Sequence, residues 1–144
     1  MTHIDIKAVA RRTWEEIFPA VDDAALAEVV ADDCINHEGP EGDSTASQGL
    51  AGARRVMHWL GGAFTEQRYD IHRVLADEDT VAVYLTYSGR HTGEFMGMAP
   101  TGRRFAAPAV HIVRFENGKG AEHWAVRDDA TMMRQLGGEP ARPV

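Results

Sequence analysis

The chain has 144 residues, a net charge of −7 and a single cysteine, and 44% of its residues are hydrophobic. This length fits one domain over residues 1–144, and the lone cysteine excludes a disulfide framework within the chain. The acidic balance argues against a nucleic-acid partner, and no apolar run reaches the ~20 residues of a membrane-spanning helix. We therefore expect a small cytoplasmic protein that handles a small molecule or a protein partner.

The first part of the chain is predicted to be helical. Apolar residues recur at helical spacing over residues 6–17, 24–30 and 50–64. Between the second and third of these segments, residues 36–44 are rich in turn formers and are predicted to be a loop. Cys34 is expected at the apolar end of the second helix, packed rather than nucleophilic.

After position 64 the hydrophobic period changes from 3.6 to 2, which indicates strands. The predicted strands cover residues 69–75, 80–91, 103–115 and 120–126. Asn117-Gly118 is a strong hairpin signal because both residues accept positive φ. A last helix is predicted over residues 130–136, ending at a glycine pair.

Helices followed by an antiparallel sheet predict an α+β fold in which about three helices pack on one face of the sheet. A curved sheet covered in this way leaves a cone-shaped pocket between its two layers. We expect the functional site in that pocket.

His111 is the most informative of the seven histidines. Strand alternation places it on the same face as Val113 and Phe115, where it is either a hydrogen-bonded core residue or a general base. His123 lies in the next predicted strand, beside Ala125. Because the connecting hairpin is short, one face of the sheet can hold both imidazoles.

Other polar residues have a structural and a functional interpretation. Asp128 precedes the last helix as an N-cap or acts as an acid–base group, and Asn36 either ends the second helix or faces the pocket. His91 is expected at a solvated strand end or in the pocket. The sequence has no HExxH, His-x-His or cysteine cluster and no GxGxxG or Walker motif, so we expect no metal and no nucleotide cofactor.

Five motifs occur in an order typical of one family. They are Ile35-Asn36-His37, Gly89-Arg90-His91-Thr92-Gly93-Glu94-Phe95, Met98-Ala99-Pro100-Thr101-Gly102-Arg103, Arg114-Phe115-Glu116-Asn117-Gly118-Lys119 and Arg134-Gln135-Leu136-Gly137. With them the chain resembles the SnoaL-like polyketide cyclases (ester cyclases) of the nuclear-transport-factor-like superfamily. The resemblance implies a cone with a deep apolar pocket, a homodimer or homotetramer, and an intramolecular aldol ring closure that uses no metal or cofactor.

In the cyclases a strand aspartate serves as acid–base group, supported by a histidine on the neighbouring strand. His111 matches this histidine, whereas the aspartate position falls on Ala125, which cannot transfer a proton. The resemblance therefore favours the hydroxylase-like branch of anthracycline biosynthesis, whose members also lack that aspartate. His111, His123 and Asn36 would orient and deprotonate a phenol there, with molecular oxygen and a reductant from a separate reductase.

Two alternatives stay open. One is a true cyclase whose base is Asp128 or His123, and the other is an accessory protein that binds a polyketide without chemistry of its own. In each case the pocket would contact the polyketide through aromatic and imidazole side chains. The predicted contact residues are Trp14, Phe18, His37, Trp59, Phe64 and His91.

Overall fold

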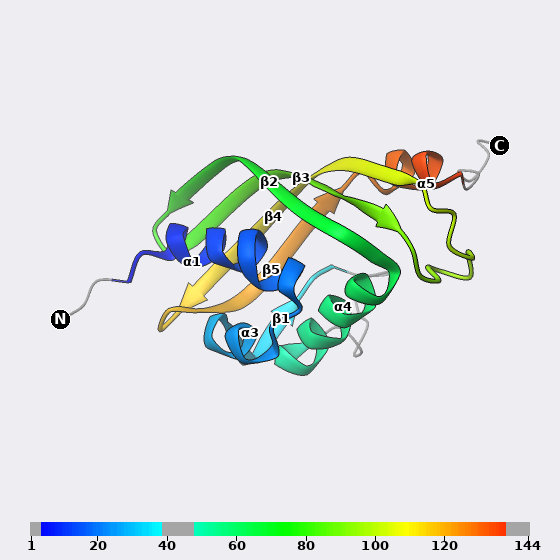
Figure 1. Ribbon diagram of the computed structural model, residues 1–144. Coiled ribbons are helices and arrows are strands. Elements are labelled where there is room, and N and C mark those ends of the chain that lie inside the picture. Colours follow the sequence, from blue (N-terminus) through cyan, green and yellow to red (C-terminus); the bar gives the residue numbers. More distant parts are fainter. Residues whose placement is uncertain (1–3, 39–47, 138–144) are drawn as a thin grey trace.

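A computed structural model describes residues 4–38 and 48–137 of the chain. It has a five-stranded sheet in the order β1-β5-β4-β3-β2 (Figure 1). The strands are β1 (Val30–Asn36), β2 (Phe64–Asp77), β3 (Thr80–His91), β4 (Arg104–Glu116) and β5 (Lys119–Arg127). The helical elements are α1 (Ile6–Arg12), the π-helical turn η1 (Thr13–Ile17), α2 (Phe18–Ala20), α3 (Asp23–Val29), α4 (Gly49–Ala63) and α5 (Asp129–Leu136).

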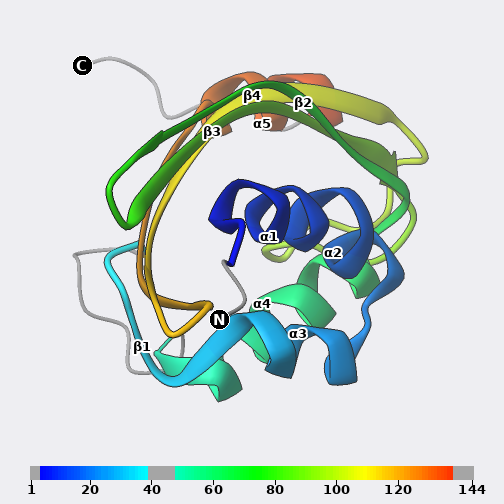
Figure 2. The ribbon, with the colours of Figure 1, turned by 90° about the vertical axis from the view of Figure 1, so that its left-hand side faces the viewer.

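The sheet curves around the N-terminal helices. Figure 2 shows α1 and α2 inside the curve, with α3 and α4 closing its open side. α5 packs against β4 at the end of the molecule far from the N-terminus (Figure 1). This arrangement confirms the predicted α+β fold, with a helical layer on the inner face of a curved sheet.

Strand β1 was not expected from the sequence. Residues 30–36 form an edge strand parallel to β5, and Cys34 lies buried in this strand rather than at the end of a helix. Parallel pairing is irregular here, because the register shifts between Val30 and Ile35. The segment shows little polar–apolar alternation, so its periodicity did not indicate a strand.

The boundary between α4 and β2 also differs from the prediction. Phe64 was expected to end the third helix but is the first residue of β2, which runs to Asp77. The Asn117-Gly118 hairpin is confirmed, since both residues have positive φ, 52° and 79°. The side chain of Asp5 caps α1 by accepting hydrogen bonds from the backbone N–H groups of Lys7 and Ala8.

The first helix is continuous from Ile6 to Ala20 but passes through the π-helical turn η1. This turn buries Thr13, Trp14 and Ile17 against the interior of the molecule. The Thr13 hydroxyl donates a hydrogen bond to the Val9 carbonyl at 2.8 Å, which satisfies this buried polar group locally. The wide turn thus places an indole on the inner face of the sheet.

Candidate functional site

A pair of histidines lies on the inner face of β4 and β5. In the antiparallel register His111 is opposite Ala125 and Val113 is opposite His123, so both imidazoles face the same side. His111 Nδ1 is 3.0 Å from His123 Nε2, and the two rings are nearly parallel. The His111 residue is only 7% exposed. The structure therefore brings together the two histidines that strand alternation placed on one face.

Asn36 at the end of β1 completes a hydrogen-bonded chain with this pair. It is the register partner of His123, and its Oδ1 is 2.9 Å from His123 Nδ1. The backbone N–H of Glu38 donates to the same Oδ1 at 3.0 Å, which identifies that atom as an acceptor. Asn36 thus lies beside the histidines, at the end of a strand. The alternative interpretation, in which Asn36 ends the second helix, is wrong.

The acceptor at Asn36 fixes the tautomers of both rings. His123 must carry its proton on Nδ1, so its Nε2 accepts a hydrogen bond, and His111 must donate that bond from Nδ1. A neutral His111 then keeps its lone pair on Nε2. Among the described residues, no hydrogen bond involves this nitrogen. His111 Nε2 is therefore the basic atom of the hydrogen-bonded series Asn36–His123–His111.

Both imidazoles are held neutral by their surroundings. Burial lowers the pKa of His111 well below its ordinary value, and the neighbouring His123 and Arg127 lower it further. Burial, with the charges of Arg127 and His37, lowers the pKa of His123 to about 4. At neutral pH the pair is therefore uncharged and can accept a proton from a ligand.

Glu38 and Arg127 form an ion pair beside the histidines that the sequence analysis missed. Arg127 is opposite Ala109 in the β4–β5 register, on the inner face, and its Nη2 is 2.6 Å from Glu38 Oε2. Burial raises the pKa of the Glu38 carboxyl, which Arg127 partly counteracts. Side chains two residues apart on a strand share a face, so Arg127 could have been placed on the face of His123 from the sequence. Glu38 could not, because it follows β1, a strand that was not predicted.

Aromatic rings cover the site from the helical layer. The Trp14 ring lies 4.6 Å from the ring of His111, centre to centre. Phe18 contacts Tyr69 edge-on, and Tyr69 stacks on Tyr87 at 4.4 Å. Burial is the first cause that raises the pKa of both tyrosines, so their hydroxyl groups remain protonated near neutrality. Trp14 and Phe18 thus lie in this interior, and their contact with a substrate stays a prediction.

A second group of predicted residues lies elsewhere in the fold. Phe64 contacts the rings of Phe95 and His91, and Trp59 stacks on Phe95. His91 was expected at a solvated strand end but is fully buried, and its Nδ1 accepts a hydrogen bond from the backbone N–H of Thr101. These side chains pack around the junction of α4 and β2.

His37 and Asp128 lie outside the histidine chain. His37 stacks on Trp124 and binds the Glu122 carboxylate at 2.7 Å, on the face of the sheet opposite to His111. Asp128 is exposed and caps α5, accepting hydrogen bonds from the backbone N–H and the hydroxyl of Thr131. The structure confirms the N-cap interpretation of Asp128.

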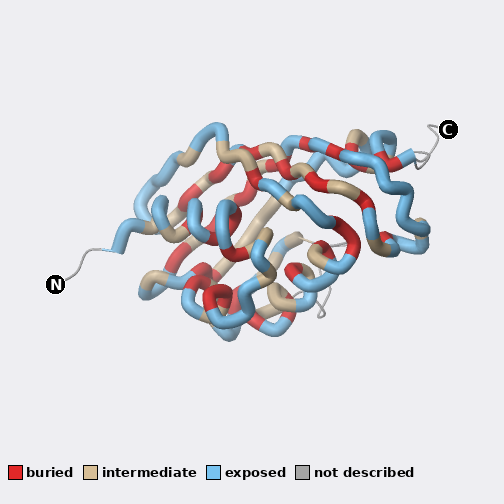
Figure 3. The backbone as a smooth tube through the Cα atoms, viewed as in Figure 1, coloured by how far each residue is buried: buried red, intermediate tan, exposed pale blue. Residues whose placement is uncertain are grey.

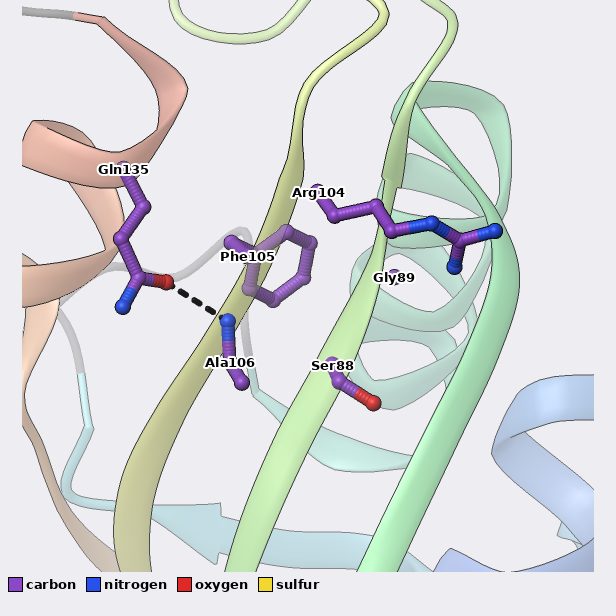
Figure 4. A pocket seen from close by; sticks show the side chains of 6 residues that line it. All are labelled: Ser88, Gly89, Arg104, Phe105, Ala106 and Gln135. Atoms are coloured by element: carbon purple, nitrogen blue, oxygen red, sulfur yellow. Dashed lines mark hydrogen bonds between the residues drawn. The ribbon is translucent and has the colours of Figure 1, made fainter.

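Two hollows lie away from the histidines. The larger, about 400 Å³, is beside α5 (Figure 4). It is lined by Ser88, Gly89, Arg104, Phe105, Ala106 and Gln135. The other, about 290 Å³, is lined by Asp5, Lys7, Ala8, Arg11 and Val74. Neither lining includes His111, whose ring is covered by Trp14.

No group of three or more histidine, cysteine, aspartate or glutamate side chains suited to a metal ion occurs in residues 4–38 and 48–137. Within the same residues, none of the helices is both long and apolar enough to cross a membrane. The polar groups of the site instead bond to one another, from Asn36 to His111.

The ordered motifs, the curved sheet and the inner-face histidine agree with one family of known proteins. The family described as SnoaL-like polyketide cyclase matches residues 8–136. The chain belongs to this family. As a SnoaL-like protein it carries alanine, at position 125, opposite its inner-face histidine.

The chain is 36% identical over 84 residues to nogalonic acid methyl ester cyclase of Streptomyces nogalater, covering 58% of this chain and 63% of that protein. It is 38% identical over 80 residues to aklanonic acid methyl ester cyclase AcmA of Streptomyces galilaeus, covering 55% and 56%. The matched part therefore spans less than two thirds of these curated relatives.

Solved structures show the same fold over nearly the whole length. TsrD from Streptomyces laurentii superposes with a TM-score of 0.81 at 21% identity, covering 94% of this chain and 98% of TsrD. AclR, described as a putative hydroxylase from Streptomyces galilaeus, has a TM-score of 0.80 at 28% identity, covering 96% and 88%. The fold prediction for this SnoaL-like protein is thereby confirmed.

Proposed function

We propose that this SnoaL-like protein is a tailoring enzyme that removes an acidic proton from an aromatic polyketide of the anthracycline type. The observation that carries the proposal is the hydrogen-bonded chain Asn36–His123–His111, which leaves His111 Nε2 as a neutral, buried base. Burial keeps this imidazole unprotonated and so free to accept a proton at neutral pH, and the exclusion of water strengthens the polar interactions around the reacting groups. Phenols and carbons between two carbonyl groups are acidic enough for an imidazole.

A hydroxylation is the first candidate reaction. The alanine opposite His111 leaves the site without the strand aspartate of the cyclases, and likeness to the putative hydroxylase AclR supports this branch. His111 would remove the phenol proton, and the electron-rich phenolate would then react with molecular oxygen. One oxygen atom enters the product, and a separate reductase supplies two electrons that, with two protons, reduce the other to water.

Ring closure is the second candidate. It is favoured by the names of the curated relatives, which are ester cyclases of nogalonic and aklanonic acid methyl esters. Here His111 would remove a proton from carbon alpha to a carbonyl, and the enolate would attack a second carbonyl in the same molecule. The proton then returns to the new alkoxide, so the product is an isomer of the substrate.

Product mass separates these reactions. The protein is incubated with nogalonic acid methyl ester, with and without oxygen and a reductase system, and the products are analysed by mass spectrometry. A product heavier by one oxygen atom supports hydroxylation, and an isomer supports ring closure. A bound but unchanged ester in all conditions contradicts both reactions for this substrate and favours a binding protein.

The role of His111 is tested by His111→Gln with His72→Gln as the matched control. His72 is an exposed histidine on β2 that bonds to Thr86, outside the site. We expect His111→Gln to reduce kcat at least ~100-fold, as the loss of a general base does, and His72→Gln to leave kcat unchanged. Equal activity of both variants would remove His111 from the mechanism.

We also propose that two or more copies of the chain assemble through the outer face of the sheet. Tyr84, Val110 and Val126 form one row across β3, β4 and β5, and Val126 is 77% exposed. Covering such a row removes apolar area from water. A Val126→Glu variant should elute as a smaller species in light-scattering chromatography; an unchanged mass would contradict this interface.

A further inference from the structure

The interior beside the histidine pair holds a carboxyl group that the proposed reaction does not yet use. Glu38 follows β1 by two residues, and its side chain is only 14% exposed. Its backbone N–H donates to Asn36 Oδ1, the same atom that His123 Nδ1 contacts. The backbone of Glu38 and the ring of His123 are therefore held together by one acceptor.

The two carboxyl oxygens of Glu38 face different groups, the guanidinium of Arg127 and the neutral imidazole of His123. Oε2 is 2.6 Å from Arg127 Nη2, and Oε1 is 3.9 Å from His123 Nδ1. The second distance is too long for a hydrogen bond but short enough for charges to interact strongly in a buried place. Arg127 thus orients the carboxyl group so that one oxygen is left facing the imidazole.

The charges around the pair show what this carboxylate does. Arg127 disfavours a proton on either histidine, and no carboxylate stands at position 125 opposite His111. Asp129 is 3.8 Å from Arg127 but 71% exposed, so water screens its charge. His37, although on the other face of the sheet, also disfavours a proton on His123, and Tyr69 and Tyr87 are neutral at neutral pH. Among the described residues, Glu38 is the carboxyl group that lies within 4 Å of a ring nitrogen of the pair, at 3.9 Å from His123 Nδ1.

We propose that Glu38 is the positioning residue of this site, where it supplies from the end of β1 the negative charge that is missing at position 125. When His111 Nε2 takes a proton from the substrate, the positive charge spreads to His123 through their hydrogen bond. The Glu38 carboxylate stabilises that charge until the proton leaves. No bond to Glu38 forms or breaks, so it acts through His123 and not on the substrate.

This inference rests on the proposed function only for its effect on catalysis, so it is tested first without substrate. NMR follows the ring signals of His111 and His123 against pH in the wild-type chain and in Glu38→Gln. Because the variant loses a negative charge and keeps Arg127, we expect the pH at the midpoint of the titration of the pair to fall. Glu122→Gln is the matched control, since that carboxylate binds His37 and Arg114 on the outer face.

The outcomes separate the two proposals. A midpoint in Glu38→Gln that stays unchanged or rises overturns the role of Glu38, whatever the activity. If Glu38→Gln does not fold, Arg127→Met gives the complementary result: loss of its charge should raise the midpoint, and a fall or no change would overturn the charge arrangement.

Activity is measured second. We expect Glu38→Gln to lower kcat about 10-fold with little change in KM, because Glu38 acts through His123 and not on the bound polyketide. Glu38→Asp keeps the charge and should recover part of the loss. A lowered midpoint with unchanged kcat would leave Glu38 as the charge partner of the pair and contradict His111 as the base.

Discussion

Two imidazoles in contact inside a protein titrate as one unit. The first proton taken by the His111–His123 pair is shared through a 3.0 Å hydrogen bond, and it makes a second proton unfavourable. The Asn36 oxygen breaks the symmetry of the pair because it only accepts. The side-chain amide of Asn36 at the end of β1 therefore sets the donor-to-acceptor direction of both hydrogen bonds, from His111 to His123 and from His123 to Asn36.

Acid should destabilise the fold through this pair. In the unfolded chain both histidines titrate near 6.5, whereas in the folded chain the pKa of His123 is about 4 and that of His111 is well below 6.5. Between these values the unfolded chain binds more protons, so stability is present above pH 6.5 and is lost as the pH falls toward 4. Each such histidine contributes roughly 1.4 kcal/mol per pH unit in that window.

Urea unfolding at pH 7 and pH 5 measures this loss. A His111→Gln variant removes one of the two groups and should show a shallower decrease in the free energy of unfolding between these pH values. His72→Gln, which alters an exposed histidine, should show the wild-type decrease. Parallel curves for all three chains would contradict the low pKa of the buried pair.

The acceptor at Asn36 should control the tautomer of His123. In Asn36→Leu the Nδ1–H of His123 loses its partner, which we expect to cost about 1–3 kcal/mol of stability and to allow the proton to move to Nε2. Nitrogen chemical shifts of the ring report the tautomer directly. Asn36→Asp keeps an acceptor oxygen and is the control; a wild-type tautomer in Asn36→Leu would show that Asn36 is not what fixes it.

At the scale of single elements, helix ends and strands follow from local chemistry. α5 is capped at its start by Asp128, whose carboxylate accepts hydrogen bonds from Thr131, and at its end by Gly137 with a φ of 91°. Both features were predicted from the residue types, because a short acidic side chain caps a helix start and glycine accepts positive φ. The strands β3 and β4 were predicted for a similar reason, since buried and more exposed residues alternate along both (Figure 3).

Replacing the cap tests whether Asp128 is structural. We expect Asp128→Ala to lower the free energy of unfolding by about 1 kcal/mol and to leave kcat unchanged, because the residue caps α5 outside the histidine chain. Asp128→Asn should keep most of the stability, since asparagine also caps helices. Chemical unfolding and a turnover assay measure the two effects; a large loss of kcat in Asp128→Asn would instead support Asp128 as an acid–base group.

The elements that escaped prediction depend on contacts distant in sequence. β1 forms because it can pair with the edge of β5, and no pattern in residues 30–36 predicts that pairing. The π-helical turn at Thr13–Ile17 changes which side of the helix faces the sheet, and helical periodicity alone does not reveal it. The histidine pair was predictable from alternation along two adjacent strands, but Glu38 was not, because its place depends on β1.

At the scale of the molecule, the site lies where the first strand meets the last. Asn36 ends β1 and Glu38 follows it by two residues, and His111, His123 and Arg127 come from β4 and β5. Four antiparallel strands connected along the chain build most of the sheet, and β1 joins it at an edge with an irregular register. We therefore expect the part of the site that depends on β1 to have a lower free energy of local opening than the centre of the sheet.

Hydrogen exchange should resolve this difference. We expect the backbone amides of β1 to exchange through openings of lower free energy than those of β3 and β4, which have a hydrogen-bonded neighbour on each side. Mass spectrometry of peptides after labelling measures both regions in one experiment. Equal protection of β1 and β4 would show that the edge strand opens only with the whole fold.

The parallel pairing of β1 with β5 also matters while the chain is being made. Residues 30–36 leave the ribosome long before Lys119–Arg127, at a usual rate of roughly 5–20 residues per second. During those seconds β5 has not yet been made, so residues 30–36 have no strand to pair with. Cys34 and a few other apolar side chains of this segment then remain exposed to water. Its two aspartates, Asp32 and Asp33, bring to this segment the kind of charge that discourages pairing between unpaired strands. The hydrogen-bonded chain from Asn36 to His111 is thus among the last parts of the protein to become complete.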